Sequence, residues 1–474
     1  MPVNSTHPQY DAALPAWTMC SDFVNGTTAV KAKGEKYLPR PNPNDDSLDA
    51  MQRYKNYLKR AVFYEYSSKT VSQYIGLAFK QDPICELDER LAAMKYNADG
   101  QGTSLYHQAQ KGLKSLLVNG RFGIWVDFPT QESKTSQKDD TALPKLLFYP
   151  AQSIINWRDD MIVLQEMVSI ATDDPFVVKR VEQWRVLGID EVGYYVEVWT
   201  KGEDGFSVNG RQYPKQHGDK HWQTIPFQIF GSQYNTFDEQ EIPIEPLVHI
   251  EQGIYCNSAD AENSRFICGQ IQPFLNVDNQ TADWYKDKKL KLGSETVIML
   301  GEHGSFGFAQ ASPNTMATEG IADKRQIISE LGYQLGQSGG GIKTATQADN
   351  EQQAQHSQVS LCVANINEGF TNLLNWCNLY KGAEKPPKFT IRQQFNQTAV
   401  NMELLQGLAS LIDGGKLPKA VLYDKAKEYN LLDVELSHDD IDGMIEANNY
   451  EAINQFGATK KLFERSISAD GKAD

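Results

Sequence analysis

The residues with the clearest potential for chemistry lie in a glycine-rich segment in the second half of the chain. Residues 336–340 read Gly-Gln-Ser-Gly-Gly and satisfy the pattern G-x-S-x-G, in which a serine hydrolase presents its nucleophile on a strained turn between a strand and a helix. The serine here is Ser338. Helix-forming residues precede it, and no apolar strand leads into it, so the context that this chemistry needs is missing. A serine hydrolase that uses Ser338 is kept as an alternative function.

The same glycines nearly form a phosphate-binding loop. The segment continues as Gly341-Ile342-Lys343-Thr344. In a P-loop the lysine follows the last glycine directly, because consecutive backbone amides must converge on one phosphate, and here Ile342 separates the two residues. This spacing argues against ATP binding.

Histidines, cysteines and clustered carboxylates show no metal-ligand pattern. The eight histidines are scattered without an HExxH motif, and the six cysteines lie far apart without CxxC spacing. Asp439, Asp440 and Asp442 follow Ser437 at an expected helix start, where carboxylates typically cap the helix. We therefore predict no catalytic residue, no metal and no cofactor, and a protein that is not an enzyme.

Composition limits the function classes further. A chain of 474 residues with 40% hydrophobic residues is expected to fold into two or three regions. Its formal net charge of -15 repels phosphate, which disfavours a conventional basic DNA-binding protein. Residues 1–7 contain neither a cationic start nor an apolar stretch, and no later apolar run approaches the length of a membrane span. We expect neither secretion nor a membrane.

The first half of the chain combines helices with a region of short strands. Apolar residues at helical spacing predict helices at 46–66, 87–94 and 104–118. Beyond the turn at 119–123, β-rich runs separated by turns predict strands at 145–149, 162–170, 181–187, 193–200 and 224–230. Consecutive strands without intervening helices indicate an antiparallel sheet, so the fold class is α+β. Trp17, Trp157, Trp184 and Trp199 are interpreted as packing residues of this half.

The second half is dominated by three long helices. They are predicted from 245 to about 270, from 318 to 337 and from 344 to 380, with a glycine loop between the second and the third. A strand at 388–393 and several short helices over 401–474 follow.

This order of elements resembles the portal proteins of tailed bacteriophages, whose regions are called wing, stem, clip and crown. Local sequence carries the resemblance over about residues 7–380. It is similar to one portal subfamily in the segments His7-Pro8-Gln9-Tyr10 with Trp17, Ala29-Val30-Lys31, Tyr37-Leu38-Pro39-Arg40, 149–157, 257–263 with Gly269, Gln270 and Pro273, and 343–346.

The resemblance implies a domain map for the portal fold. It comprises a wing at 1–244, helical over 1–118 and antiparallel β over 119–244, a first stem helix at 245–273, a small α/β clip at 274–317, a second stem helix at 318–337, a tunnel loop at 338–343, a long wing helix and strand at 344–400, and a helical crown at 401–474.

The implied function is structural. Portal subunits, usually twelve, form a ring at one capsid vertex, and double-stranded DNA is packaged and ejected through the channel of that ring. The expected partners are other copies of the chain, DNA, the large terminase, the major capsid or scaffolding protein and a tail adaptor, and no membrane. The expected location is the virion, after assembly in the host cytoplasm. A different head-tail adaptor or scaffold protein is the second alternative, although adaptors are usually shorter.

The resemblance places DNA contacts in the tunnel loop. Its residues are Gln337, Ser338, Gly339, Gly340, Gly341 and Lys343. Glycine tolerates many backbone conformations, which would let the loop follow a DNA strand while the Lys343 ammonium contacts phosphate. The alternative is that Lys343 starts a helix and touches no DNA.

Two further groups of charged residues are candidates for the channel. A basic cluster in the clip is either a contact for the motor, connector or DNA, or a solvated face; it consists of Lys286, Lys288, Lys289 and Lys291. An acidic wall would let a polyanion slide without tight binding, and the first stem helix offers Glu251, Asp260 and Glu262 for it. These three carboxylates could equally form an outer solvated face.

Overall fold

The computed structural model describes the chain except for residues 1, 129–142, 171–173, 175, 278–280, 284–297, 302, 311–314, 332, 334–344, 393–401, 429–430, 433–435 and 447–474, and except for the side chains of 345–357. The chain divides into two compact units, residues 1–393 and 394–474. Each unit is described by itself below.

The first unit begins with helices, as the sequence predicts. They are α1 (Pro8–Val24), α2 (Thr27–Ala32), α3 (Leu48–Arg60), α4 (Tyr66–Ala78) and α5 (Leu105–Asn119), with the short 3-10 helices η1 (Gly34–Lys36) and η2 (Glu89–Lys95). The helix expected at 87–94 is thus the 3-10 helix η2. The helix expected at 104–118 is α5, which begins where the Ser104 side chain accepts a hydrogen bond from the His107 N–H and ends at Gly120, whose φ is 70°.

The single helix predicted over 46–66 is wrong, because the structure breaks it between α3 and α4. Ser258 of a distant helix bonds both backbone groups of Val62, accepting from its N–H at 2.9 Å and donating to its carbonyl at 2.7 Å. Glu65 then adopts a left-handed conformation with φ of 57° before α4 starts. A tertiary contact therefore overrides the local helical periodicity.

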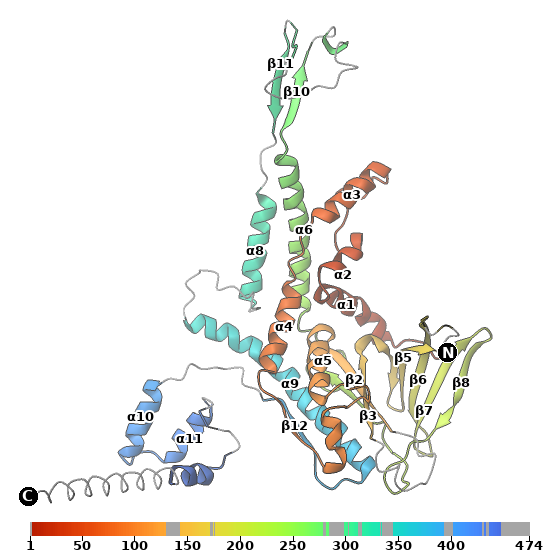
Figure 1. Ribbon diagram of the computed structural model, residues 1–474, viewed down its shortest axis with the longest axis vertical. Helices are drawn as coiled ribbons and strands as arrows, with labels where there is room; N and C mark the ends of the chain where they lie inside the picture. Colours follow the sequence, from red (N-terminus) through yellow and green to blue (C-terminus); the bar gives the residue numbers. More distant parts are fainter. Residues whose placement is uncertain are drawn as a thin grey trace, which may run out of the picture. The chain divides into compact units, whose positions relative to one another are not determined.

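Two antiparallel sheets follow, which confirms the α+β class and the predicted antiparallel pairing. A three-stranded sheet has the order β3-β2-β9 and a five-stranded sheet the order β4-β5-β6-β7-β8. The strands are β2 (Arg121–Asp127), β3 (Lys145–Pro150), β4 (Ile154–Arg158), β5 (Met161–Ile170), β6 (Lys179–Ile189), β7 (Tyr194–Gly202), β8 (Gly205–Gln212) and β9 (Phe227–Gly231), with the 3-10 helix η3 (Ala151–Ser153) before β4. Figure 1 shows both sheets in yellow tones beside the N-terminal helices.

A long helix packs on the smaller sheet and forms the core of the unit. This helix, α9 (Ala345–Lys381), corresponds to the one predicted from 344 to 380, and it contacts β9 and β2. Phe370 of α9 lies between Phe230 of β9 and Phe389, with ring centroids 5.7 and 4.8 Å away. Phe389 belongs to β12 (Lys388–Thr390), which pairs antiparallel with β1 (Ile84–Glu86) from the N-terminal helical part.

Gly369 allows α9 to approach β9 closely, and we expect Gly369→Ala to lower the free energy of unfolding by about 1–3 kcal/mol. A Cβ there would lie 2.2 Å from the Phe230 ring, which itself stacks on Phe122 at 4.3 Å and has no room to retreat. Chemical denaturation of the full chain measures the change. Gly76→Ala in α4 is the matched control, because its Cβ would meet no atom within 4 Å and the better helix propensity of alanine should slightly stabilise the protein. Equal effects of both substitutions would contradict the steric explanation.

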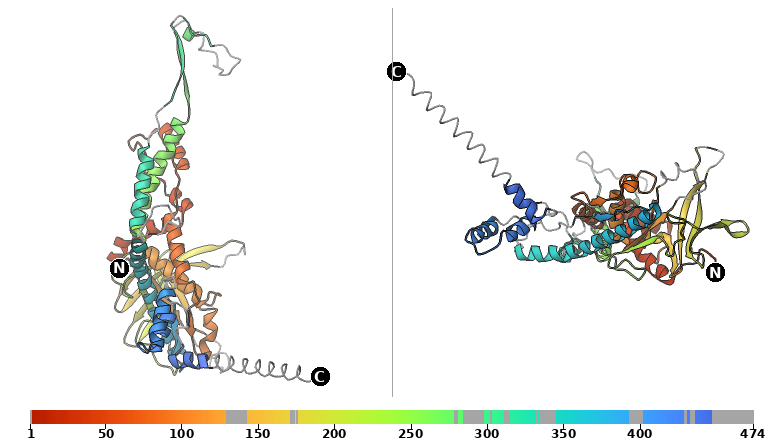
Figure 2. Two further views of the ribbon diagram at one scale, coloured as in Figure 1. Left: turned by 90° about the vertical axis from the view of Figure 1, so that its left-hand side faces the viewer. Right: turned by 90° about the horizontal axis from the view of Figure 1, so that it is seen from below.

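Between the sheets and α9 the chain forms a helical hairpin with a β-ribbon between its two helices. Its parts are α6 (Glu245–Cys268), β10 (Gln272–Asn276), β11 (Ser305–Ala309) and α8 (Met316–Glu330). β10 and β11 pair antiparallel, and α6 packs against α8 (Figure 1; Figure 2, left). We call the described residues of this segment the stem hairpin. Among the described residues, no helix combines the length and apolar character that crossing a lipid bilayer requires.

The second unit contains short helices, as predicted. They are α10 (Met402–Asp413), α11 (Lys419–Glu428) and a helical stretch at 438–446. Ser437 caps that stretch: its hydroxyl accepts from the Asp440 N–H at 3.1 Å, while the Asp440 carboxylate accepts from the Ser437 N–H at 3.0 Å. The predicted capping role of this acidic cluster is confirmed for Asp440.

Candidate functional site: the stem hairpin and its flanking faces

The first helix of the stem hairpin, α6, is held by contacts on several sides. Its 24 residues extend about 36 Å at 1.5 Å per residue, and Pro246 stands in its first turn, where proline is tolerated. Leu247, Ile254 and Ala259 are buried, and α6 contacts α1, α3, α4 and α8. α6 therefore packs against α8 within the hairpin and, through α1, α3 and α4, joins the hairpin to the rest of the unit.

Glu251 does not belong to an exposed acidic wall, so that expectation is wrong for this residue. Its side chain is 1% exposed. One carboxylate oxygen accepts from the Tyr66 N–H at 2.6 Å, and the other accepts from the N–H of Ser67 at 2.9 Å and from the Ser67 hydroxyl. Tyr66 and Ser67 are the first residues of α4, whose amides have no partner within their own helix. Glu251 thus caps α4 from across the interface.

Burial raises the pKa of Glu251 to about 7, against the hydrogen bonds from Ser67 and Tyr66, which lower it. The ordinary value is 4.5, so the folded state holds a proton that the unfolded state releases between pH 4.5 and 7. Glu251 therefore stabilises the fold fully below pH 4.5, and that contribution is lost as the pH rises through 7. A difference of this size corresponds to about 3 kcal/mol.

We therefore expect the stability of the wild type and that of Glu251→Gln to depend differently on pH. Glutamine is neutral at every pH, so the stability of the wild type relative to this variant should fall as the pH rises from 5 to 8, by about 1–3 kcal/mol. Thermal melts of both proteins in matched buffers measure it. The comparison removes the contribution of other carboxylates, such as Glu166, whose pKa is lowered although burial alone would raise it, because Arg185 hydrogen-bonds it. A stability difference that stays constant across this range would contradict the assignment.

The other two predicted wall residues lie on the upper part of α6 and have partners. Asp260 is exposed to solvent, and its carboxylate accepts a hydrogen bond from the Tyr57 hydroxyl at 2.7 Å. Glu262 is half-buried and forms an ion pair with Arg265, one turn further along. Both positions stay compatible with a wall or with a solvated face.

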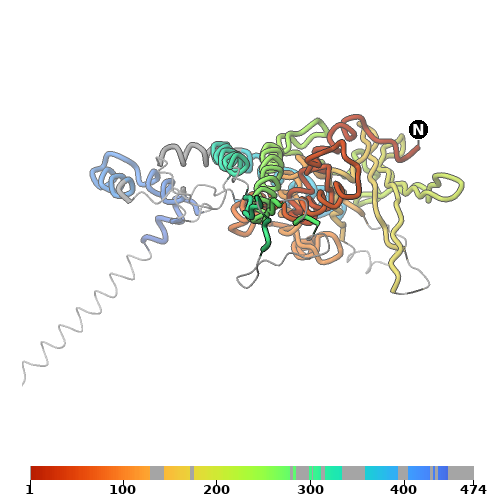
Figure 3. Tube along the Cα trace, turned by 90° about the horizontal axis from the view of Figure 1, so that it is seen from above, coloured from red at the N-terminus to blue at the C-terminus, as the bar shows by residue number. Residues whose placement is uncertain are grey.

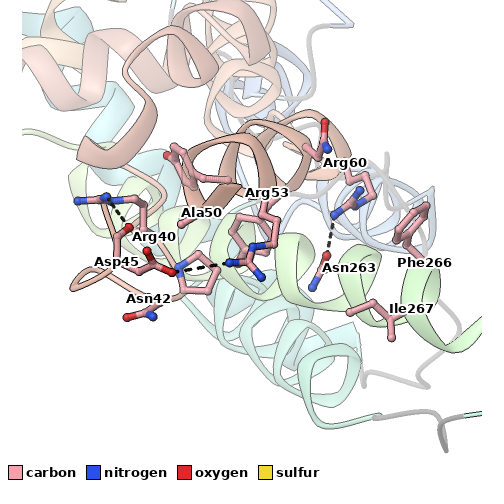
Figure 4. Close-up of a pocket in the computed structure, with 13 residues that line it drawn as sticks. Arg40, Asn42, Asp45, Ala50, Arg53, Arg60, Asn263, Phe266 and Ile267 are labelled. Atoms are coloured by element: carbon pink, nitrogen blue, oxygen red, sulfur yellow. Dashed lines mark hydrogen bonds and ion pairs between the residues drawn. The ribbon is translucent and has the colours of Figure 1, made fainter. Parts of the chain in front are cut away.

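A groove lies between α3, the segment before it and the end of α6 (Figure 4). It encloses about 490 Å³. Three arginines, an aspartate, several polar residues and two apolar side chains of α6 line it: Arg40, Pro41, Asn42, Asp45, Ala50, Arg53, Tyr54, Asn56, Tyr57, Arg60, Asn263, Phe266 and Ile267. Arg40 pairs with Asp46 and Arg53 with Asp49, whereas Arg60 donates to the Asn263 amide oxygen at 2.7 Å and lies over the Phe266 ring.

The second helix of the hairpin, α8, exposes an acidic face that the sequence reasoning missed. Ile321 and Ile328 are buried. At about 100° per residue, the opposite side of the helix carries four exposed polar residues at i, i+4, i+7 and i+11, which are Glu319, Asp323, Gln326 and Glu330. We call these four residues the α8 acidic face. The i, i+4, i+7 and i+11 spacing of these four residues is readable in the sequence.

The remaining predicted site residues lie outside the described residues. These are the tunnel loop, Gln337, Ser338, Gly339, Gly340, Gly341 and Lys343, and the clip lysines Lys286, Lys288, Lys289 and Lys291. Within the part of the chain that the structure describes, no group of three or more histidine, cysteine, aspartate or glutamate side chains is arranged to hold a metal ion.

Comparisons with known proteins give three findings. A family model described as "Domain of unknown function (DUF4055)" matches residues 243–381, which span the stem hairpin and α9. No curated protein matches the chain. Among solved structures, the chain is similar to one from the neck of an empty GTA particle computed with C6 symmetry, at 11% identity and a TM-score of 0.42 over 84% of this chain and 99% of the other. It is also similar to one from the neck of a native GTA particle computed with C12 symmetry, at 12% identity and a TM-score of 0.39 over 84% and 99%.

Proposed function

We propose that this protein is a portal subunit of a tailed bacteriophage or a phage-like particle. Copies of it form a ring, of twelve subunits in the expected case, at one capsid vertex. Double-stranded DNA passes through the channel of the ring during packaging and ejection. The protein acts through assembly and not as an enzyme.

The observation that supports the proposal most is the stem hairpin. Two packed helices with an antiparallel ribbon between them stand in the chain between the antiparallel sheets and the long helix α9. This is the order of wing, stem, clip and wing helix that the sequence resemblance implies. The β10–β11 ribbon then takes the position of the clip, where the large terminase and later the tail adaptor dock, and the clip lysines are proposed to contribute to that docking.

A ring of identical subunits requires unlike faces that match around a closed rotation. The stem hairpin provides such faces, because α6 is flanked by different elements on its two sides (Figures 1 and 3). The net charge of -15 per subunit favours a channel that does not bind DNA tightly, since each phosphate contact that a protein makes adds affinity and slows movement.

The oligomeric state tests the proposal. Mass photometry of the purified full chain should show a particle of about 640 kDa, twelve times the chain mass of 53.3 kDa, and negative-stain images should show rings with a central hole. A monomer that reacts with a fluorophosphonate probe at Ser338 would instead support the serine hydrolase. A small oligomer without a central hole would support another head-tail adaptor or scaffold.

The proposed DNA contact of the tunnel loop gives a separate prediction. Lys343→Ala should slow packaging and weaken its dependence on salt, because one phosphate contact per subunit is lost. Packaging rates of particles assembled with either protein, measured from 50 to 200 mM salt, give the answer. Lys343→Arg keeps the positive charge and should behave like the wild type. Unchanged rate and salt dependence in Lys343→Ala would show that Lys343 does not contact DNA.

A further inference from the structure

We infer that the α8 acidic face of one subunit binds the outer face of α3 of the neighbouring subunit. This inference rests on the proposed ring and specifies the contact that closes it. The occupant of each face is therefore a second copy of the chain.

The outer face of α3 repeats the spacing of the α8 acidic face with opposite charge. Tyr57 is buried and bonds Asp260 of α6, so it marks the inner side of α3. Four exposed residues at i, i+4, i+7 and i+11 lie roughly opposite, and they are Leu48, Gln52, Lys55 and Lys59. The two stripes have the same length, and each carries a glutamine among its charged residues.

Neither set of charges is neutralised within the subunit. Lys55 and Lys59 make no ion pair with any residue that the structure describes. The carboxylates of Glu319 and Asp323 likewise make no ion pair with any described residue. The Glu330 carboxylate accepts a hydrogen bond from the Gln326 amide at 2.8 Å, and it too forms no ion pair with a described residue. Two exposed faces that carry uncompensated charges of opposite sign are complementary.

The positions of the two helices prevent them from meeting within one subunit. α3 and α8 lie on opposite sides of α6, as Figures 1 and 3 show, where α8 is teal, α6 green and α3 orange-red. Each charged face lies on the side of its helix opposite the buried residues, which are Ile321 and Ile328 on α8 and Tyr57 on α3. In a head-to-tail ring the outer side of α8 in one subunit faces the outer side of α3 in the next.

Apolar side chains beside the charges add area to the contact. Leu48 is 91% exposed on α3, and Met316 is 76% exposed at the start of α8. An interface in which apolar residues are surrounded by complementary charges is typical of protein–protein contacts.

Charge reversal with rescue tests the inference. Lys55→Glu with Lys59→Glu should reduce the fraction of rings, measured by mass photometry at fixed protein concentration, at least tenfold. Glu319→Lys with Asp323→Lys should do the same. The chain that carries all four reversals should regain rings, because the two faces exchange sign together. Rings of the wild type should also dissociate as NaCl rises from 0.05 to 1 M, since exposed charges are screened.

Lys201→Glu with Lys220→Glu is the matched control, because it reverses two exposed lysines of the larger sheet region and should leave the rings intact. Melting of the separated subunits should be unchanged in all variants, which excludes misfolding. If the wild type forms rings and either double reversal leaves them intact, the pairing is wrong while the portal function stands. Failure of the fourfold chain to regain rings also overturns the pairing. A wild type without rings overturns the proposed function, and this inference with it.

Discussion

Replacing Glu251 with alanine is expected to lower the free energy of unfolding of the chain by about 3–5 kcal/mol at pH 7. The substitution leaves the N–H groups of Tyr66 and Ser67 and the Ser67 hydroxyl without their acceptor, in a place that water reaches poorly. Each buried donor that loses its partner costs about 1–3 kcal/mol. Tryptophan fluorescence during urea denaturation measures the loss.

Glu251→Gln should lose less than the alanine variant, because the amide oxygen still accepts one hydrogen bond from the start of α4. Glu262→Ala is the control on the same helix: its carboxylate is only half-buried and pairs with Arg265, so the loss should stay below about 1 kcal/mol. Comparable losses for Glu251→Ala and Glu262→Ala would contradict the capping role of Glu251.

Glu251 also shows where reading a sequence for charge reaches its limit. A glutamate is usually exposed, and nothing near Glu251 in the sequence indicates a partner for its carboxylate. Its partners, the first amides of α4, lie 185 and 184 residues away. They need an acceptor because Glu65, the residue before α4, uses its own carboxylate on Thr27 and not on its own helix. The residue that caps α4 is therefore set by tertiary packing and not by the local sequence.

Long periodic segments were predicted more accurately. The helix expected from 344 to 380 is α9 at 345–381, and the helix expected from 245 is α6, which begins at Glu245 after Pro243. In the second half of α9, many buried apolar residues recur at helical spacing, so the helix does not depend on any single contact. The break between α3 and α4 went unpredicted because it rests on distant residues, among them Ser258 with its two bonds to Val62.

Arg121 supports the second prediction. It begins β2, is 4% exposed, and its guanidinium lies between the rings of Trp17 and Trp157, with distances of 4.6 and 4.3 Å to the ring centroids. Among the residues that the structure describes, its buried Nε and Nη2 have no hydrogen-bond partner, and burial lowers its pKa to about 10. Two cation–π contacts therefore hold a charge that pairs with no carboxylate in the described part of the chain. The sequence identified both tryptophans as packing residues but not the cation between them.

We expect Arg121→Ala to lower the free energy of unfolding by about 3–5 kcal/mol, because it opens a cavity between the two indoles and removes both cation–π contacts. Arg121→Met keeps most of the volume and removes a buried charge, so the two effects oppose each other and the loss should be about 1–2 kcal/mol. Arg121→Lys should lose more than Arg121→Met, since a compact ammonium is more strongly hydrated than a guanidinium and does not stack as a plane between two rings. Urea denaturation of the three variants at one protein concentration gives the order. A lysine variant as stable as the wild type would show that charge alone is sufficient, and that the planar guanidinium has no special role between Trp17 and Trp157.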